Sequence, residues 1–187
     1  MLYLFSVLVT SIMSLNDFPE VKQMKFCSKG LDLIPLGGKL APQISSDLHD
    51  IDTSTVSGQI EYSNVSEGMP DANNCICKHI ISGRYKIQGL ESASSEIFIG
   101  YTKENEVQHI VIKVKDYDFN NLKDSLEKVY GRPEAEITGG MNGQQHKSYS
   151  WLSSGIDIYF SGLGNSITFS FPRPKEYFDR LIKGNPW

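Results

Sequence analysis

The sequence predicts an α+β domain in which an antiparallel β-sheet, partly a meander, has one or two helices packed on one face. Segments of alternating apolar residues occur in groups, and single amphipathic helices separate those groups. Connections such as residues 103–105 have the length of hairpin loops. Runs of strands separated by single helices favour an antiparallel sheet with helices packed against it.

The chain of 187 residues is expected to form one domain behind an apolar N-terminal segment. Residues 1–15 carry no charge and fit the apolar region of a secretory signal peptide, so a periplasmic or secreted location is expected. An uncleaved anchor is the alternative, because no Lys or Arg precedes the apolar run. The segment is shorter than the roughly 20 residues of a membrane-spanning helix. We therefore expect a single domain over 16–187 without stable membrane insertion, with 16–84 as a candidate degenerate version of the regular half, 85–187.

The charge balance argues against nucleic acid as a partner. The chain has 22 acidic and 18 basic side chains, a formal net charge of -4. Binding to a phosphate backbone needs a basic surface, which this composition does not indicate.

The first half contains the less regular elements. Turn formers concentrate in 66–74, which predicts a loop there. The other predicted elements are a short strand within 30–40, at most a short helix within 41–55, an edge strand over 57–65, and a strand over 75–87 interrupted at 82–83.

The second half contains the strongest local signal, a helix that follows a predicted hairpin of strands 96–102 and 106–115. Asp118 is a candidate N-cap, and Gly131 followed by Pro133 is a typical helix end. Apolar residues between them fall at helical spacing on one side. The remaining predicted elements are a polar loop over 134–145, three strands over 147–152, 156–161 and 166–171, and a short helix over 175–183.

A hairpin, then DFNNLKDSLEKVYGRP at 118–133, then a meander containing Trp151 resembles uncharacterised exported bacterial proteins. Their helix-on-sheet unit is similar to the repeat of beta-lactamase inhibitory protein, and the similarity covers roughly residues 85–171. The resemblance implies a non-enzymatic exported protein that presents a concave sheet to a partner. No contact motif of the inhibitor is recognisable, so no site residue is carried over.

The three cysteines admit several interpretations. In an oxidising compartment, Cys27 is expected to form a disulfide with Cys75 or Cys77. On a strand, Cys75, Cys77 and His79 would share a face, as three metal ligands could, although a single residue between the cysteines departs from the usual zinc spacing. Free buried thiols and a metal- or thiol-dependent site on Cys75, Cys77 and His79 therefore remain alternatives.

The candidate binding residues are Tyr149, Trp151, Tyr159 and His146. Tyr and Trp are the side chains that most often anchor interfaces. Alternation puts Tyr149 and Trp151 on one face, and that face is alternatively the core under the helix. His146 follows a Gly-rich loop and precedes a strand.

No nucleophile elbow and no phosphate-binding loop motif occurs in the sequence, and no cofactor is predicted. The leading hypothesis is a non-enzymatic exported protein that binds a protein partner, most concretely an inhibitor or immunity protein that blocks a hydrolase or toxin. The alternatives are the metal- or thiol-dependent site and a structural or small-ligand-binding envelope protein.

Overall fold

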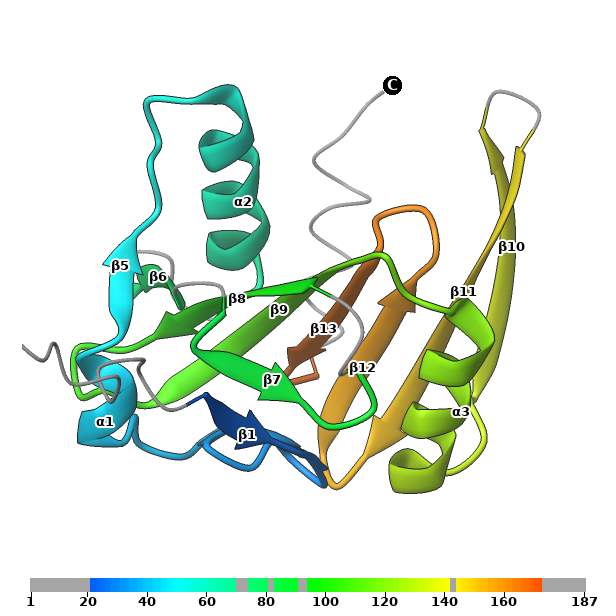
Figure 1. Cartoon of the computed structure of the whole chain (residues 1–187), viewed down its shortest axis with the longest axis horizontal. Coiled ribbons are helices and arrows are strands. Elements are labelled where there is room, and N and C mark those ends of the chain that lie inside the picture. Colours follow the sequence, from blue (N-terminus) through cyan, green and yellow to red (C-terminus); the bar gives the residue numbers. More distant parts are fainter. Residues whose placement is uncertain (1–20, 70–73, 81–82, 91–93, 142–143, 173–187) are drawn as a thin grey trace, which may run out of the picture.

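An eight-stranded antiparallel sheet forms the centre of the molecule (Figure 1). The computed structural model describes residues 21–69, 74–80, 83–90, 94–141 and 144–172. The predicted signal peptide over 1–15 and the predicted helix over 175–183 lie outside these residues. In spatial order the strands are β10 (Ala135–Met141), β11 (Gln144–Ser153), β12 (Ile156–Ser161), β13 (Ser166–Ser170), β9 (Val107–Lys115), β8 (Ser94–Tyr101), β6 (Ile76–Ile80) and β5 (Leu48–Asp50).

The other described elements are three helices and two small sheets. The helices are α1 (Pro42–Ser45), α2 (Val56–Glu67) and α3 (Phe119–Tyr130). One small sheet pairs β1 (Lys22–Met24) with β7 (Tyr85–Ile87) in parallel, and the other contains β2 (Phe26–Cys27), β3 (Gly30–Leu31) and β4 (Ile34–Pro35). The predicted α+β class is confirmed. Within the described ranges, no helix has the length and apolar character of a membrane span.

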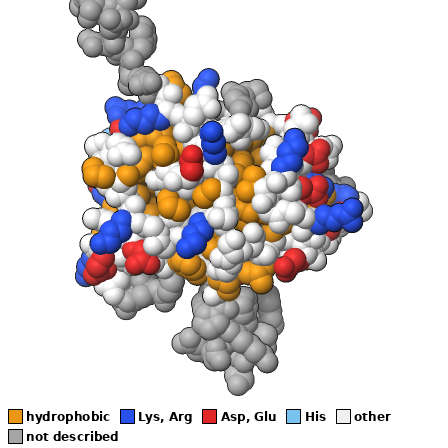
Figure 2. Space-filling model, turned by 90° about the horizontal axis from the view of Figure 1, so that it is seen from below, with side chains coloured by type: hydrophobic (Ala, Val, Ile, Leu, Met, Phe, Trp, Pro, Cys, Tyr) orange, Lys and Arg blue, Asp and Glu red, His pale blue; other side chains and the backbone are white. Residues whose placement is uncertain are grey.

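The face of the large sheet that carries α3 and the small sheets, here called the packed face, holds the main core (Figure 1). Leu122 and Leu126 of α3 are buried there against side chains such as Ile110, Ile112 and Phe169. Figure 2 views the molecule from this side, where apolar and charged side chains are interspersed on the outer surface.

The sequence signals at the two ends of α3 are confirmed. Asp118 Oδ1 accepts a hydrogen bond from the Asn121 N–H at 2.9 Å, which satisfies one of the unpaired amides of the first turn. Gly131 closes the helix with a φ of 82° and donates its N–H to the Glu127 carbonyl. Both caps use local geometry, so the sequence alone was sufficient to place them.

The helix α2 packs on the opposite face of the sheet, and the predicted edge strand over 57–65 is wrong. Thr55 caps α2, with its Oγ1 accepting from the Gly58 N–H at 3.0 Å. Val65 of α2 is fully buried against a second cluster that includes Phe98 and Val111. Because Val65 is the one buried residue among those of α2, the sequence lacks the apolar stripe by which a helix is usually detected.

Two other predictions are corrected. The segment 134–145, predicted as a loop, contributes β10 and the start of β11, which pair over seven residue positions. Cross-strand pairing stabilises these polar residues as strands although their composition is typical of a loop. The strand predicted within 30–40 is replaced by the short strands β3 and β4.

Most of the remaining strand predictions are confirmed. The hairpin β8–β9 and the meander β11–β12–β13 occur at the predicted positions. The segment 75–87 divides into β6 and β7, and β7 leaves the large sheet to pair with β1. The strands β6 and β8 pair directly across the predicted boundary between 16–84 and 85–187, so both parts contribute to one sheet.

A buried carboxylate joins β7 to the segment after α1. The Tyr85 hydroxyl donates to Asp47 Oδ2 at 2.6 Å, Arg84 Nη1 contacts the other oxygen, and Lys22 Nζ lies 3.7 Å from Oδ2. Asp47 is 5% exposed. The hydrogen bond from Tyr85 and the cationic Arg84 lower the pKa of Asp47, while burial and the Asp47 contact raise the pKa of Tyr85 to about 12.

Candidate functional site

In the second half of the sheet, one face carries none of the helices formed by the described residues; it is here called the open face. It consists of the side chains of β10–β13 that point away from α3. In β12, the side chains of Ile156, Ile158 and Phe160 are buried on the packed face, whereas Asp157 and Tyr159 point to the open face. Tyr159 is 39% exposed.

The open face lies between two raised elements. In Figure 1, α2 and the β10–β11 hairpin rise on the same side of the sheet, with β12 and β13 between them. The helix α2 packs over Phe98 of β8 and Val111 of β9, which follow β13 in the order of strands. Two hollows are lined by open-face residues of the strands β10 to β13, and this hollowed surface is here called the trough, with β12 and β13 as its floor.

The strand register brings the floor residues together from three strands, β11, β12 and β13. Tyr159 lies opposite Ser150 of β11 on one side and Thr168 of β13 on the other. Asp157 lies opposite Leu152 and Ser170 in the same way. Side chains directly opposite each other in antiparallel strands have Cβ atoms about 5 Å apart, so these residues form two adjacent rows.

Two hollows lie in this trough, with volumes of about 650 Å³ and about 200 Å³. The larger is lined by residues that include His109, Glu134, Leu152, Asp157, Thr168 and Ser170. The smaller is lined by Ile137, Gly139, His146, Ser148, Ser161 and Leu163. Tyr159 borders both hollows, so its ring separates them.

Apolar side chains are exposed around these hollows. Leu152 at the larger hollow is 52% exposed, and Ile137 and Leu163 at the smaller one are exposed to a similar extent. Single exposed apolar residues are common on soluble proteins, but a group around concave surface marks a candidate contact site. Together with Tyr159 they form such a group.

The larger hollow has acidic character. Burial, followed by the negative charge of Glu134, raises the pKa of Asp157. Both carboxylates line the hollow. A cationic group placed there would be attracted by two negative charges in a partly desolvated position.

No protein-family model, no curated protein and no solved structure matches this chain. The resemblance to the repeat of beta-lactamase inhibitory protein therefore stays a prediction. The function proposed below rests on the geometry of the site.

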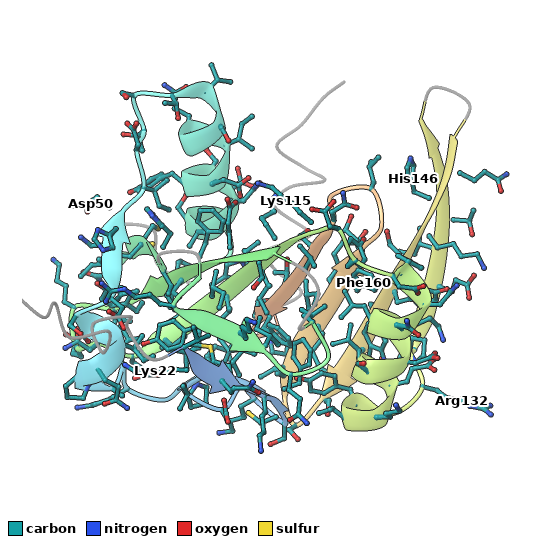
Figure 3. All side chains as sticks on the ribbon, viewed as in Figure 1. Lys22, Asp50, Lys115, Arg132, His146 and Phe160 are labelled. Atoms are coloured by element: carbon teal, nitrogen blue, oxygen red, sulfur yellow. The ribbon has the colours of Figure 1, made fainter. Side chains whose placement is uncertain are left out.

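Two of the four predicted binding residues lie on the open face. Tyr159 is at its centre. His146 lies opposite Gly139 in the β10–β11 ladder and lines the smaller hollow. Figure 3 shows His146 towards the far end of that hairpin. The pair is separated along the strands, so each contributes to a different part of the trough.

The prediction that Tyr149 and Trp151 bind a partner is wrong, because both lie in the core. They are 3% and 2% exposed. The Trp151 Nε1–H donates to the Gly131 carbonyl at 2.8 Å, and the Tyr149 ring lies 5.9 Å from the ring of Phe119 in α3. The alternative interpretation, that their face is the core under α3, is the correct one.

The sequence did not single out Leu152, Ile137, Leu163 or Asp157. Alternation within β12 was available as a signal, since its three apolar positions 156, 158 and 160 predict that Asp157 and Tyr159 lie on the other face. The contributions of the other strands depend on register, which a single sequence does not specify.

The expected disulfide between Cys27 and the Cys75–Cys77 segment is not present. All three cysteines are free thiols. Cys27 belongs to β2 on the packed face, and its carbonyl accepts from the Tyr130 hydroxyl at 2.8 Å. Cys77 packs on the α2 side against Phe98 and Val111, so the large sheet separates it from Cys27.

Cys75, Cys77 and His79 do share a face, as predicted. Cys75 and Cys77 belong to the cluster under α2, and the His79 ring lies 6.1 Å from the ring of Phe98 in the same cluster. In the part of the chain that the structure describes, however, no group of three or more His, Cys, Asp or Glu side chains is placed to hold a metal ion. The three-ligand arrangement with His79 is therefore not formed.

Proposed function

We propose that this protein is an exported, non-catalytic binding protein whose open face receives a protruding segment of a protein partner. The observation that supports this proposal is the group of exposed apolar side chains around Tyr159 and its two hollows. Export is part of the proposal on the strength of the apolar residues 1–15.

Tyr159 has the properties of an interface anchor. Tyrosine contributes a large apolar ring with few rotatable bonds, and its hydroxyl can remain hydrogen-bonded when the ring is covered. The ring lies between the two hollows, where side chains of a partner would surround it on both sides. Leu152 and Ile137 would supply apolar contact beside it.

The acidic hollow favours a partner that presents a basic side chain next to an apolar one. Asp157 and Glu134 lie at one end of the trough, and Leu152 lies opposite Asp157. Complementary charge increases both the rate and the selectivity of association. An inhibitor or immunity protein that blocks a hydrolase or toxin is the most concrete version of this function.

A pair of matched variants tests the proposal. Tyr159→Ser removes the anchor, whereas Ile60→Ser removes an exposed apolar side chain from α2, where it is 53% exposed. Wild type and both variants are immobilised at equal density, and proteins retained from native extracts are quantified by mass spectrometry. Because removal of an anchor typically costs at least about 2 kcal/mol, we expect the affinity of a specific partner to fall about 30-fold with Tyr159→Ser and to be unchanged with Ile60→Ser.

Contact is then localised by a photo-crosslinking amino acid at position 152. A partner that crosslinks at 152 and depends on Tyr159 supports the proposal. A partner retained equally by both serine variants, or retention of no protein by the wild type, argues against it.

A small ligand in the larger hollow is the second candidate function. Its volume of about 650 Å³ lies within the usual range of ligand pockets, about 300–1,000 Å³. Native mass spectrometry of the purified protein distinguishes the two candidates, because a bound metabolite adds a defined mass that Tyr159→Ser should reduce.

A further inference from the structure

Two thiols lie side by side beneath α2, away from the open face. Cys75 immediately precedes β6 and Cys77 belongs to it, and both pack against the same apolar cluster. Side chains two residues apart on a strand point to the same face, so both thiols lie on the α2 side of the sheet. Cys77 is buried and Cys75 is half-buried, so the pair has a protected side and a side that solvent reaches.

A third sulfur atom approaches Cys77 from the end of α2. Cys77 lies directly opposite Gly100 in the β6–β8 ladder. The Met69 Sδ atom lies 2.6 Å from the point where a Cβ atom on Gly100 would stand. The thioether therefore occupies the space that a side chain at position 100 would take, next to the Cys77 side chain on the same face.

The surroundings of these sulfur atoms are apolar. Val65 and Phe98 belong to the buried cluster around Cys77. Apolar walls exclude water and strengthen bonds between thiolates and a cation.

Burial makes the two thiols unequal. Cys77 is buried and Cys75 is half-buried, so an ion that arrives from solvent reaches Cys75 first. A thiol gives up its proton when it binds a metal, because the cation compensates the charge of the thiolate.

The spacing of the thiols suits a bridging ion better than a direct disulfide. Residues two apart in an extended chain are separated by about 6.6 Å, whereas a disulfide holds its Cβ atoms about 3.5–4.5 Å apart. Two metal–sulfur bonds of about 2.3 Å in line span about 4.6 Å. Two thiols at this spacing can therefore reach a common ion placed between them.

We propose that Cys75, Cys77 and Met69 form a binding site for a soft monovalent metal ion, Cu(I), for which Ag(I) is a suitable substitute in experiments. Two thiolates and one thioether are soft ligands, the type that selects Cu(I). Binding displaces one proton from each thiol, and the resulting complex of one cation with two thiolates carries one negative charge. This site is independent of the open face and of its proposed partner.

The proposal is tested by metal titration of the full-length protein, reduced and kept without oxygen. Ag(I) binding is followed by native mass spectrometry, and Cu(I) affinity is measured by competition with a chromogenic Cu(I) chelator. We expect one tightly bound ion per chain. Cys75→Ser and Cys77→Ser remove one arm of the chelate and should weaken binding at least about 100-fold. Met69→Leu keeps the apolar volume and should weaken it about tenfold.

Two further variants are matched controls. Cys27→Ser removes the thiol on the packed face, and His79→Gln removes the imidazole next along β6. Both should leave the stoichiometry and affinity unchanged. Circular dichroism and the melting temperature of each metal-free variant establish that it is folded. If Cys77→Ser does not fold, the test rests on Cys75→Ser, because Cys75 is only half-buried.

Three results would overturn the proposal. The first is the absence of a tightly bound Ag(I) or Cu(I) ion on the reduced wild type. The second is unchanged affinity in folded Cys75→Ser. The third is loss of the bound ion in Cys27→Ser, which would place the site on the other face of the sheet.

Discussion

The buried carboxylate of Asp47 should be a main point of stability for the N-terminal half. Asp47→Asn preserves the shape of the side chain and removes its charge. The Asn amide also presents N–H donors, and the groups around it, the Tyr85 hydroxyl and the Arg84 guanidinium, are donors as well. At least one of these groups loses its acceptor in the variant, because both carboxylate oxygens are in use in the wild type.

The size of the effect follows mainly from the contact with Tyr85. A hydrogen bond to a charged group contributes about 1.5–3 kcal/mol. The side chains of Arg84 and Lys22 are 45% and 43% exposed, so water screens their attraction to Asp47 and their share is small. We expect the free energy of unfolding to fall by about 2 kcal/mol, and the melting temperature by about 4–8 °C for a domain of this size.

The dependence on pH has a defined direction. Folding lowers the pKa of Asp47 below the reference value of 3.8, so the folded state releases this proton more readily than the unfolded state. The stabilisation is therefore fully present above pH 3.8 and is lost as the pH falls through the lower folded pKa. Asn does not titrate, so the difference in the free energy of unfolding between wild type and Asp47→Asn should narrow as the pH falls below 3.8.

Urea unfolding followed by circular dichroism at pH 7 and at pH 3 measures this difference. Asp50→Asn is the matched control, because Asp50 forms a 2.5 Å ion pair with Lys78 but its side chain is 88% exposed. The control should leave the midpoint of unfolding unchanged at pH 7. The reasoning is refuted if Asp47→Asn is as stable as the wild type at pH 7, or if its deficit persists unchanged at pH 3.

Two other variants test the two faces of the sheet. Trp151→Phe loses the 2.8 Å hydrogen bond to the Gly131 carbonyl and leaves a smaller ring in the core. Thermal unfolding should therefore show that the free energy of unfolding falls by about 1–3 kcal/mol. A fall below about 0.5 kcal/mol would contradict the buried placement of Trp151. Asp157→Asn should change stability in the opposite direction to Asp47→Asn. Burial and the charge of Glu134 raise the pKa of Asp157, so its negative charge destabilises the fold once the pH exceeds 3.8. The variant should therefore have a higher melting temperature than the wild type at pH 7, but not at pH 3. A lower melting temperature of Asp157→Asn at pH 7 would contradict the assigned environment.

The helix α3 was predictable because its determinants are local. Asp118 caps the first turn through a backbone amide three residues away, and Gly131 supplies a backbone conformation that few other residues adopt. The apolar residues between them, such as Leu122 and Leu126, mark the buried side. None of these features depends on a distant segment of the chain.

The helix α2 and the strand β10 were not predictable in this way, because distant contacts determine them. In α2 a single buried side chain, Val65, meets a cluster formed by β6, β8 and β9. Gly100 of β8 leaves room for α2 to approach, since a Cβ there would lie 3.1 Å from Val65 Cγ1. In β10, the glycines and polar residues form a strand because β11 pairs with them. Neither partner is visible in a short window of sequence.

The exposure of Tyr159 depends on the placement of both helices. Phe119 of α3 stacks on Phe160 with ring centroids 4.7 Å apart, and this contact selects the even-numbered side chains of β12 for the core. Tyr159 must then face the other side of the sheet. The helix α2 lies on that side, but Val65 holds it over Phe98 of β8. A pattern of alternating residues can therefore assign Tyr159 to a face, whereas the position of α2 determines that this helix leaves Tyr159 uncovered.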